Sequence, residues 1–325
     1  MTKINIYKTG RIILPVLFFL VILINLSIGT VKIPISQIFN PENEKIKFLI
    51  WNVRFPRILM SLIAGSGLAL VGNIYQTIMK NPLVDPYLIG TSSGAGFGAV
   101  LALYVAVSLN RTVSVNVFSF AFSLLASLLT IILAKRKRII PITHLILSGV
   151  LISTIFSSAT ILLINLSRKT LTSAYVWLFG SLSGTTINDL TIPAISVIVL
   201  FFIALIKNKE LDAIALGEEE AKILGVDVEK IKWFFYLAGS FVISVIVSKT
   251  GIIGFVGLII PHAARILTGS KHKYSLIGSI LLGGIFLSFS DTISRTIASP
   301  IEVPIGVVTS FIGAPLMFIL LKKQK

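Results

Sequence analysis

Cysteine is absent from this chain of 325 residues, and histidine occurs only three times. Without cysteine, the protein can form no disulfide and perform no thiolate chemistry, so the sequence does not report its redox compartment. His144, His262 and His272 do not have the spacing of metal ligands. No metal site is therefore expected.

Charged residues are scarce, at 13% of the chain, while hydrophobic residues make up 55% and the mean hydropathy is +0.95. Soluble domains carry about 25% charged residues. The apolar residues occur in long runs, which predict membrane-spanning helices. The fold class indicated is an all-α polytopic membrane protein.

Acidic residues are the rarer charge, since 13 Asp and Glu stand against 29 Lys and Arg, for a formal net charge of +16. Such a charge is also typical of nucleic-acid-binding proteins. Here, however, the basic residues form short clusters between apolar runs, as do charges that orient spans and contact anionic lipid. We expect membrane lipid as a partner and no nucleic acid.

The apolar runs predict about ten spans, since a bilayer core requires about 20 helical residues. They lie near 11–29, 56–79, 88–108, 113–134, 141–165, 191–206, 233–249, 252–267, 275–298 and 303–321. The first run could also be a signal peptide, but it is long for one and no A-x-A site follows, so we expect a retained span. The run at 252–267 is short and is expected to break at Pro261.

Basic residues also predict the orientation of the chain. With the N-terminus in the cytoplasm, 19 of the 29 Lys and Arg fall in cytoplasmic segments, and the positive-inside rule favours this arrangement. Both termini are then cytoplasmic, and residues 207–232 form the largest cytoplasmic loop.

That loop contains one octad written twice, "ELDAIALG" (210–217) and "EEEAKILG" (218–225), and it holds seven of the thirteen acidic residues. Gly217 and Gly225 end the two copies, where a helix C-cap favours a left-handed residue. Glu218 begins an acidic first turn, which the helix dipole favours. The pattern predicts two short helices outside the membrane, either in a simple solvated loop or in a docking element for a soluble partner.

No glycine in the chain is followed directly by lysine, so a Walker A phosphate loop is absent. The glycine-rich stretches 65–72 and 90–99 are instead expected to let helix backbones approach closely in lipid. Apolar segments interrupted by glycine and proline, at 251–265 and 303–315, are tolerated where they line a cavity and indicate a translocation pathway. If ATP powers this protein, another chain hydrolyses it.

Seven motifs, taken in order, resemble the FecCD family of ABC permeases, which import iron–siderophore complexes, haem and vitamin B12. They are "RFPR" (54–57), "NPLVDP" (81–86), "GTSSGAGFGA" (90–99), "LSGV" (147–150), "ALGEEEAKILGV" (215–226), "GFVGLIIPHAAR" (254–265) and "PIGVVTSFIGAP" (304–315). The resemblance extends over residues 11–321.

The resemblance implies a single transmembrane permease domain over residues 1–325, with two short cytoplasmic coupling helices in the loop 207–232. It also implies the partners: two ATPase subunits, a second copy of the permease or a paralogue, and an extracytoplasmic solute-binding protein. ATP and magnesium would be bound by the ATPase, so this chain is expected to be no enzyme and to carry no cofactor. Its expected location is the cell (inner) membrane.

Residues that match the family's ATPase-coupling positions lie in this loop. By resemblance, the segment Ala215–Val226 seats in a groove of the ATPase. The matching positions are Leu216, Gly217, Glu218, Ala221, Leu224 and Gly225. Small residues would allow close backbone approach, and Glu218 would offer charge to the partner.

Three arginines match the family's docking positions for the binding protein: Arg54, Arg57 and Arg295. Exposed ion pairs contribute roughly 0–1 kcal/mol each, so these arginines would orient the partner more than hold it. Arg54 and Arg57 could instead snorkel to the membrane surface. Arg295 could instead pair with Asp291 at the i,i+4 spacing.

The pore is less marked in the sequence. By resemblance, Ser92 and Ser93 line or pack beside the pore, and Thr143 lies where the family places its inner gate. Tyr175, Trp177 and Phe179 follow the basic pair Arg168 and Lys169 and are typical of an interfacial aromatic belt.

The function predicted is therefore an ABC importer permease for iron complexes, either ferric siderophore or haem, with cobalamin as the alternative cargo. An ion-coupled secondary transporter would need several ionisable groups at membrane depth, and the chain offers Asp291 and Glu302. A membrane-embedded enzyme would need a cluster of catalytic residues, which the sequence does not contain.

Overall fold

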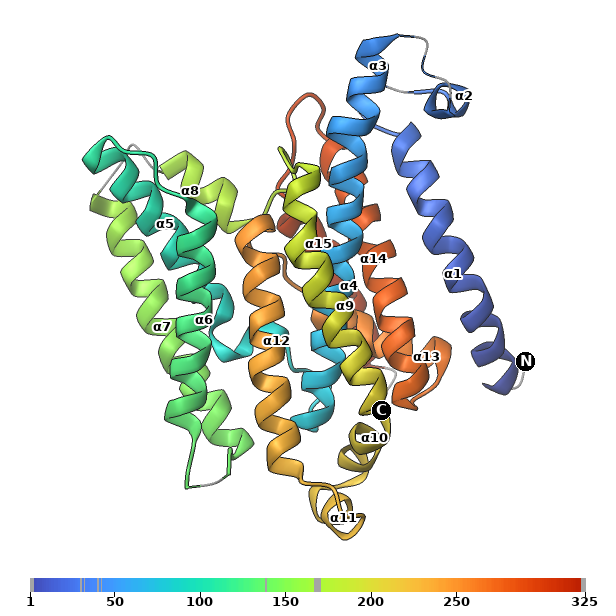
Figure 1. Ribbon diagram of the computed structural model, residues 1–325, viewed down its shortest axis with the longest axis vertical. Helices are drawn as coiled ribbons and strands as arrows, with labels where there is room; N and C mark the ends of the chain where they lie inside the picture. The colour runs from blue at the N-terminus through green and yellow to red at the C-terminus, as the bar shows by residue number, and fades with distance from the viewer. Residues whose placement is uncertain are drawn as a thin grey trace. The chain divides into compact units, whose positions relative to one another are not determined.

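The computed structural model describes residues 3–29, 31, 33–39, 41, 43–137, 139–166 and 171–322. Its regular elements are helices (Figure 1), which confirms the all-α prediction. The predicted basic pair Arg168 and Lys169 lies outside the described residues. The helices are α1 (Lys3–Ser27), α2 (Ile35–Phe39), α3 (Glu44–Phe48), η1 (Leu49–Arg54), α4 (Phe55–Ile78), η2 (Pro86–Ile89), α5 (Thr91–Leu109), α6 (Val115–Ala134), α7 (Ile142–Leu166), α8 (Leu171–Leu178), η4 (Ile187–Leu190), α9 (Thr191–Ile206), α10 (Asn208–Leu216), α11 (Glu218–Ile223), α12 (Val228–Thr250), α13 (Val256–Thr268), α14 (His272–Thr296) and α15 (Ile305–Lys322).

Eight helical stretches among these residues are long and apolar enough to cross a membrane, and α13 and α15 are shorter apolar helices. Together they correspond to the ten predicted spans. Large apolar side chains remain exposed along them, among them Phe19, Leu133 and Phe202, as expected where lipid is the solvent. The protein is a multi-pass membrane protein.

The expected break at Pro261 is wrong, because α13 runs through Pro261. The irregular stretch lies just before this helix, at residues 251–255, where Gly251 and Phe255 have φ values of 68° and 69°. These left-handed residues stop helical geometry there. Residues 35–48, which lie between the first two predicted spans, contain α2 and α3, and Asn43 caps α3 by accepting a hydrogen bond from Ile46 N.

The chain divides into two compact units. The first comprises residues 1–73, 181–201 and 254–325, and the second residues 74–180 and 202–253. The prediction of a single permease domain over residues 1–325 stays a prediction.

In the first unit, α1, α13, α14 and α15 pack together with the greater part of α4. Gly65 of α4 and Gly283 of α14 allow close contact, because a Cβ added at Gly65 would lie 2.1 Å from Gly283 O. Asn25 of α1 donates to Ser288 O of α14 and accepts from Thr292 Oγ1 at 2.8 Å. Such side-chain hydrogen bonds join spans that have no hydrophobic drive to associate in lipid.

In the second unit, α5, α6 and α7 lie side by side and α12 packs against α5 and α6 (Figure 1). Aromatic rings from three helices, Phe97, Phe122 and Phe156, fill the centre of this group. Polar contacts also cross it: Ser244 donates to Ser123, which donates to Thr91 O at 2.9 Å. Helices α10 and α11, which precede α12 in the chain, belong to the same unit.

Candidate functional site

The two predicted short helices are present as α10 and α11, and Gly217 separates them. Its φ of 173° and ψ of 151° are extended backbone, so the prediction of a left-handed Gly217 is wrong. A Cβ at this position would lie 1.5 Å from Glu220 Oε2, but the exposed Glu220 side chain can rotate away, so this contact alone does not require glycine.

Gly225 is the left-handed residue that the sequence predicts, with φ of 81°. Gly225 N donates to Lys222 O at 2.9 Å, and Val226 N donates to Ala221 O at 3.0 Å. These two bonds are the Schellman pattern that ends a helix and satisfies its last carbonyls. The sharp turn from α11 into α12 therefore depends on glycine at 225.

The predicted coupling residues divide into exposed and buried ones. Leu216 and Leu224 are 76% and 66% exposed, and neighbouring Ile223, which the sequence analysis did not select, is 86% exposed. Ala221 is fully buried and packs with Ala213, Ile214 and Val228. Three large apolar side chains are thus presented outward at the ends of α10 and α11. Their coupling role stays a prediction.

The charges of this loop mostly pair within the chain. Glu219 and Lys222 form an exposed ion pair at 2.9 Å. Lys207 Nζ lies 2.8 Å from Glu210 Oε1, and this hydrogen bond lowers the pKa of the Glu210 carboxyl. Glu218, predicted to offer charge to a partner, instead contacts Lys232 Nζ at 2.6 Å.

A cavity of about 610 Å³ lies beside the turn between α11 and α12. Its lining includes apolar residues, among them Ile203 and Phe234, and the charged residues Lys207, Glu210 and Asp227. The cavity therefore adjoins the exposed Leu224 and the glycine turn, and both belong to its wall.

The three predicted docking arginines are buried, with exposed fractions of 4% for Arg54, 7% for Arg57 and 5% for Arg295. Arg57 Nε and Nη2 hold the Asp291 carboxylate at 2.9–3.1 Å, and Nη1 donates to Glu302 Oε1 at 2.8 Å. The Asp291 side chain is 2% exposed, while Glu302 is 37% exposed. The arginine side chains therefore turn inward, whereas snorkelling would expose them.

Backbone carbonyls hold the other two arginines. Arg54 donates to Leu26 O at 2.6 Å and also to Val31 O. Arg295 donates to Asn25 O at 2.8 Å, and its Nε lies 3.8 Å from Asp291 Oδ2. The i,i+4 pair expected for Arg295 is thus present but longer than the contact between Arg57 and Asp291. Docking by these arginines stays a prediction, and Glu302 is the most accessible carboxylate that contacts them.

The predicted pore residues lie in the second unit. Ser92 and Ser93 occupy the first turn of α5, where Ser93 Oγ donates to Gly90 O at 3.0 Å. Thr143 is exposed at the second position of α7. Their roles in a pore stay predictions.

The turn that precedes α5 is held by Asp85 and Tyr87. Asp85 accepts from Tyr87 N at 2.8 Å, and Tyr87 Oη donates to Ile253 O at 3.2 Å. Burial raises the pKa of the Asp85 carboxyl to about 6, although the hydrogen bond from Tyr87 opposes the shift.

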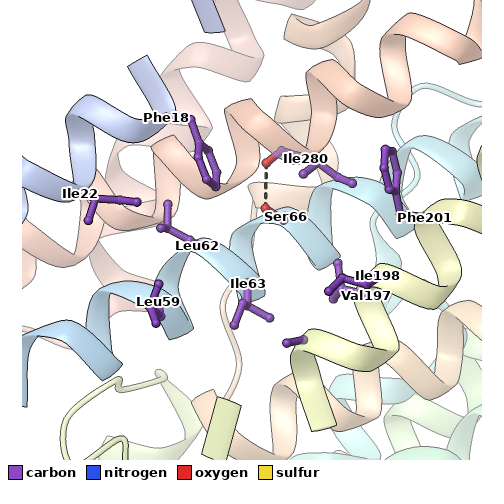
Figure 2. A pocket seen from close by; sticks show the side chains of 11 residues that line it. Phe18, Ile22, Leu59, Leu62, Ile63, Ser66, Val197, Ile198, Phe201 and Ile280 are labelled. Atoms are coloured by element: carbon purple, nitrogen blue, oxygen red, sulfur yellow. Dashed lines mark hydrogen bonds between the residues drawn. The ribbon is translucent and has the colours of Figure 1, made fainter. Parts of the chain in front are cut away.

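An apolar cavity of about 280 Å³ lies within the first unit (Figure 2). Phe18, Leu62 and Phe201 point into it. The Ser66 hydroxyl on its wall donates a hydrogen bond to Ile280 O at 2.8 Å. This cavity offers no charged group to a metal chelate. Among the residues that the structure describes, no three His, Asp or Glu side chains group as metal ligands.

Three comparisons with known proteins agree on one family. The model of the FecCD transport family matches residues 17–323. The Fe(3+)-citrate import system permease protein YfmE of Bacillus subtilis is 34% identical, and the match covers 97% of this chain and 96% of that protein. The cobalamin import system permease protein BtuC of Halobacterium salinarum is 35% identical, over 88% of this chain and 76% of that protein.

A solved structure has the same fold along its whole length. It is described as "An inward-facing conformation of a putative metal-chelate type ABC transporter". It is 31% identical with a TM-score of 0.87, and the match covers 98% of this chain and all of that one.

Proposed function

The chain belongs to the FecCD transport family, and on this premise we propose that it passes iron complexes, either ferric siderophores or haem, across the membrane. It is the permease subunit of an ABC importer, works with ATPase subunits and a substrate-binding protein, and is not itself an enzyme. The importer resides in the inner membrane.

One observation carries the choice of iron: permeases named for ferric citrate, hemin and ferric hydroxamate each match at least 95% of this chain. The solved metal-chelate type transporter supports the same chemical class. The chelated metal is cargo, so the permease requires no ligand set of its own. A pathway without strong metal ligands suits such a cargo, because a tightly held chelate would not leave.

Cobalamin is the second candidate, since its named permease in Halobacterium salinarum is as similar in sequence. Cobalamin is also a large metal chelate, so the two candidates need similar pathways. The partner proteins of this importer would distinguish them, because the binding protein selects the cargo before the permease receives it.

The assembly proposed has two copies of the permease, or one copy and a paralogue, with two ATPase subunits. Both termini and residues 207–232 lie on the cytoplasmic side, as the positions of 19 of the 29 basic residues favour. The ATPase then meets Leu216, Ile223 and Leu224, which are large apolar residues exposed outside the predicted spans. Exposed apolar groups of this kind mark a protein contact.

Uptake by cells that lack this gene tests the proposal. Radiolabelled ferric citrate, a ferric hydroxamate, haemin and cobalamin are supplied in parallel, and the gene is then returned. We expect loss of one iron complex or of haem, restored by the gene. Loss of cobalamin uptake alone would replace iron with the second candidate, and retention of all four uptakes would contradict both.

A further inference from the structure

Lys232 is a lysine in the first turns of α12 whose side chain is only 2% exposed. It is among the largest fully buried side chains of the described residues. An ammonium group removed from water is stable only when it is paired and hydrogen-bonded. Its partners therefore determine how the surrounding backbone is held.

The nearer partner of Lys232 belongs to the predicted coupling helix. Lys232 Nζ lies 2.6 Å from Oε1 of Glu218, the first residue of α11. Since α11 has six residues, it is too short to be stable alone. This ion pair and the packing of Ala221 against Val228 attach it to α12.

The second partner, Glu229, bridges Lys232 to another element. Its Oε1 lies 3.4 Å from Lys232 Nζ, and its Oε2 accepts from Ile140 N at 3.0 Å. Ile140 lies in the connection between α6 and α7, two residues before α7 begins. One carboxylate thus joins the buried lysine to this connection.

Described residues of that connection are held by hydrogen bonds and by a contact with α12. Arg136 and Ile139 exchange two backbone hydrogen bonds, each of 3.0 Å, which close the turn. Lys135 also lies over the ring of Trp233 in α12, 5.0 Å from its centroid. A displacement at Ile140 would be passed along the backbone to Thr143, which lies three residues further on in the first turn of α7.

We propose that Lys232 is a positioning residue that makes α11, the start of α12 and Ile140 move together, so that force on α11 reaches Thr143. The inference rests on the proposed function, because the force comes from the ATPase. The physical reason is the cost of separation: moving α11 away would leave a buried ammonium with one distant carboxylate. The exposed pair of Glu219 and Lys222 has no such constraint, because water replaces either partner.

Because the chain lacks cysteine, the substitution Thr143→Cys introduces a single cysteine. Its labelling reports this movement without background from other cysteines of the permease. The full complex with its ATPase is treated with a membrane-impermeant maleimide, with and without ATP and vanadate, and labelling of the permease chain is measured. We expect a several-fold change in labelling rate with ATP when Lys232 is present. We expect this change to disappear in Lys232→Met and to return in Lys232→Arg.

Two controls separate transmission from folding. Lys222→Met removes the exposed pair of the same helix and should leave the ATP-dependent change intact. Bound ATPase and ATP hydrolysis are measured for every variant, and Lys232→Met should retain both through the exposed apolar residues of α10 and α11. If Lys232→Met does not assemble, Glu218→Gln replaces it as the test, because this substitution keeps the size of the side chain and removes its charge. Glu218→Gln should lose the ATP-dependent change in labelling.

The outcomes distinguish this inference from the proposed function. An ATP-dependent change that persists in Lys232→Met or in Glu218→Gln overturns the role of Lys232 and leaves the importer intact. If ATP does not alter the labelling rate in the parent complex, then Thr143 does not move and the proposed role of Lys232 is overturned as well. Lys232→Met could lose both the ATP-dependent change and the bound ATPase. If Lys232→Arg then fails to restore the change, Lys232 has a structural role only.

Discussion

Arg57 holds the carboxylate of Asp291 through both Nε and Nη2, across 234 positions of sequence. Both side chains are nearly fully buried, so neither has water as a substitute partner. Removing one member of a buried pair costs about 3–5 kcal/mol, because the other charge is left uncompensated. This contact therefore fixes α4 against α14 within the first unit.

Asp291→Asn should lower the thermal unfolding temperature of the purified permease markedly, while Glu44→Gln should leave it nearly unchanged. The control is apt because Glu44 pairs with Lys47 at 3.4 Å in a highly exposed position, where an ion pair contributes roughly 0–1 kcal/mol. Thermal unfolding in detergent measures both variants. Equal unfolding temperatures for the two would contradict the structural role of Asp291.

Glu302→Gln tests docking without disturbing the buried carboxylate. Glu302 is 37% exposed and accepts one hydrogen bond from Arg57. If a carboxylate of the binding protein competes for that group, weakening the internal pair should tighten docking measurably, by up to about 1 kcal/mol or roughly fivefold. Affinity of the binding protein for the reconstituted complex measures this. Unchanged affinity would remove Arg57 from the docking surface.

Gly225→Val should release the ATPase from the permease. Valine is strained at the φ of 81°, and the turn that orients α11 would shift. Gly184→Val provides the matched control, since Gly184 has φ of 74° and, like Gly225, has no atom within 4 Å of an added Cβ. Co-purification of the ATPase should fall in the first variant only. A similar fall in both would show general loss of folding.

Asp85 should make the stability of the permease depend on pH. Its pKa is raised to about 6 in the folded protein and returns to about 3.9 on unfolding, so between these values the folded state binds more protons. The free energy of unfolding therefore falls as pH rises from about 4 to about 6 and stays low above that range.

Asp85→Asn should remove this dependence, because an amide retains an oxygen that can accept from Tyr87 N and does not ionise. The variant should unfold at a higher temperature than the parent at pH 7.5, by roughly 2–4 °C for each kcal/mol regained. At pH 4, where the parent carboxyl is mostly protonated, the difference should disappear. A variant less stable than the parent at pH 7.5 would contradict the raised pKa.

The sequence predicted the spans well because their signal is local. Apolar length alone places α6, α7 and α9 to within a few residues, and the repeated octad places α10 and α11. Gly225 was predicted for the right reason, since its left-handed turn is a local requirement.

Long-range contacts could not be predicted in the same way. The sequence offers Arg295 as a partner for Asp291, but nothing in it shows that the nearer partner is Arg57. Lys232 has Glu229 three residues before it, which is a visible signal, but its nearer contact to Glu218 depends on how α11 folds back. Gly217 was misassigned because its backbone is extended rather than left-handed, which the repeated octad does not show.

The most direct test of the account is ATP-driven uptake by the reconstituted importer. Proteoliposomes containing this chain, its ATPase and the binding protein are loaded with radiolabelled ferric citrate, ferric hydroxamate or haemin on the side of the binding protein. The account predicts accumulation that requires ATP on the side of residues 207–232 and is lost when the ATPase cannot hydrolyse it. Accumulation driven by a proton or sodium gradient without ATP would contradict it.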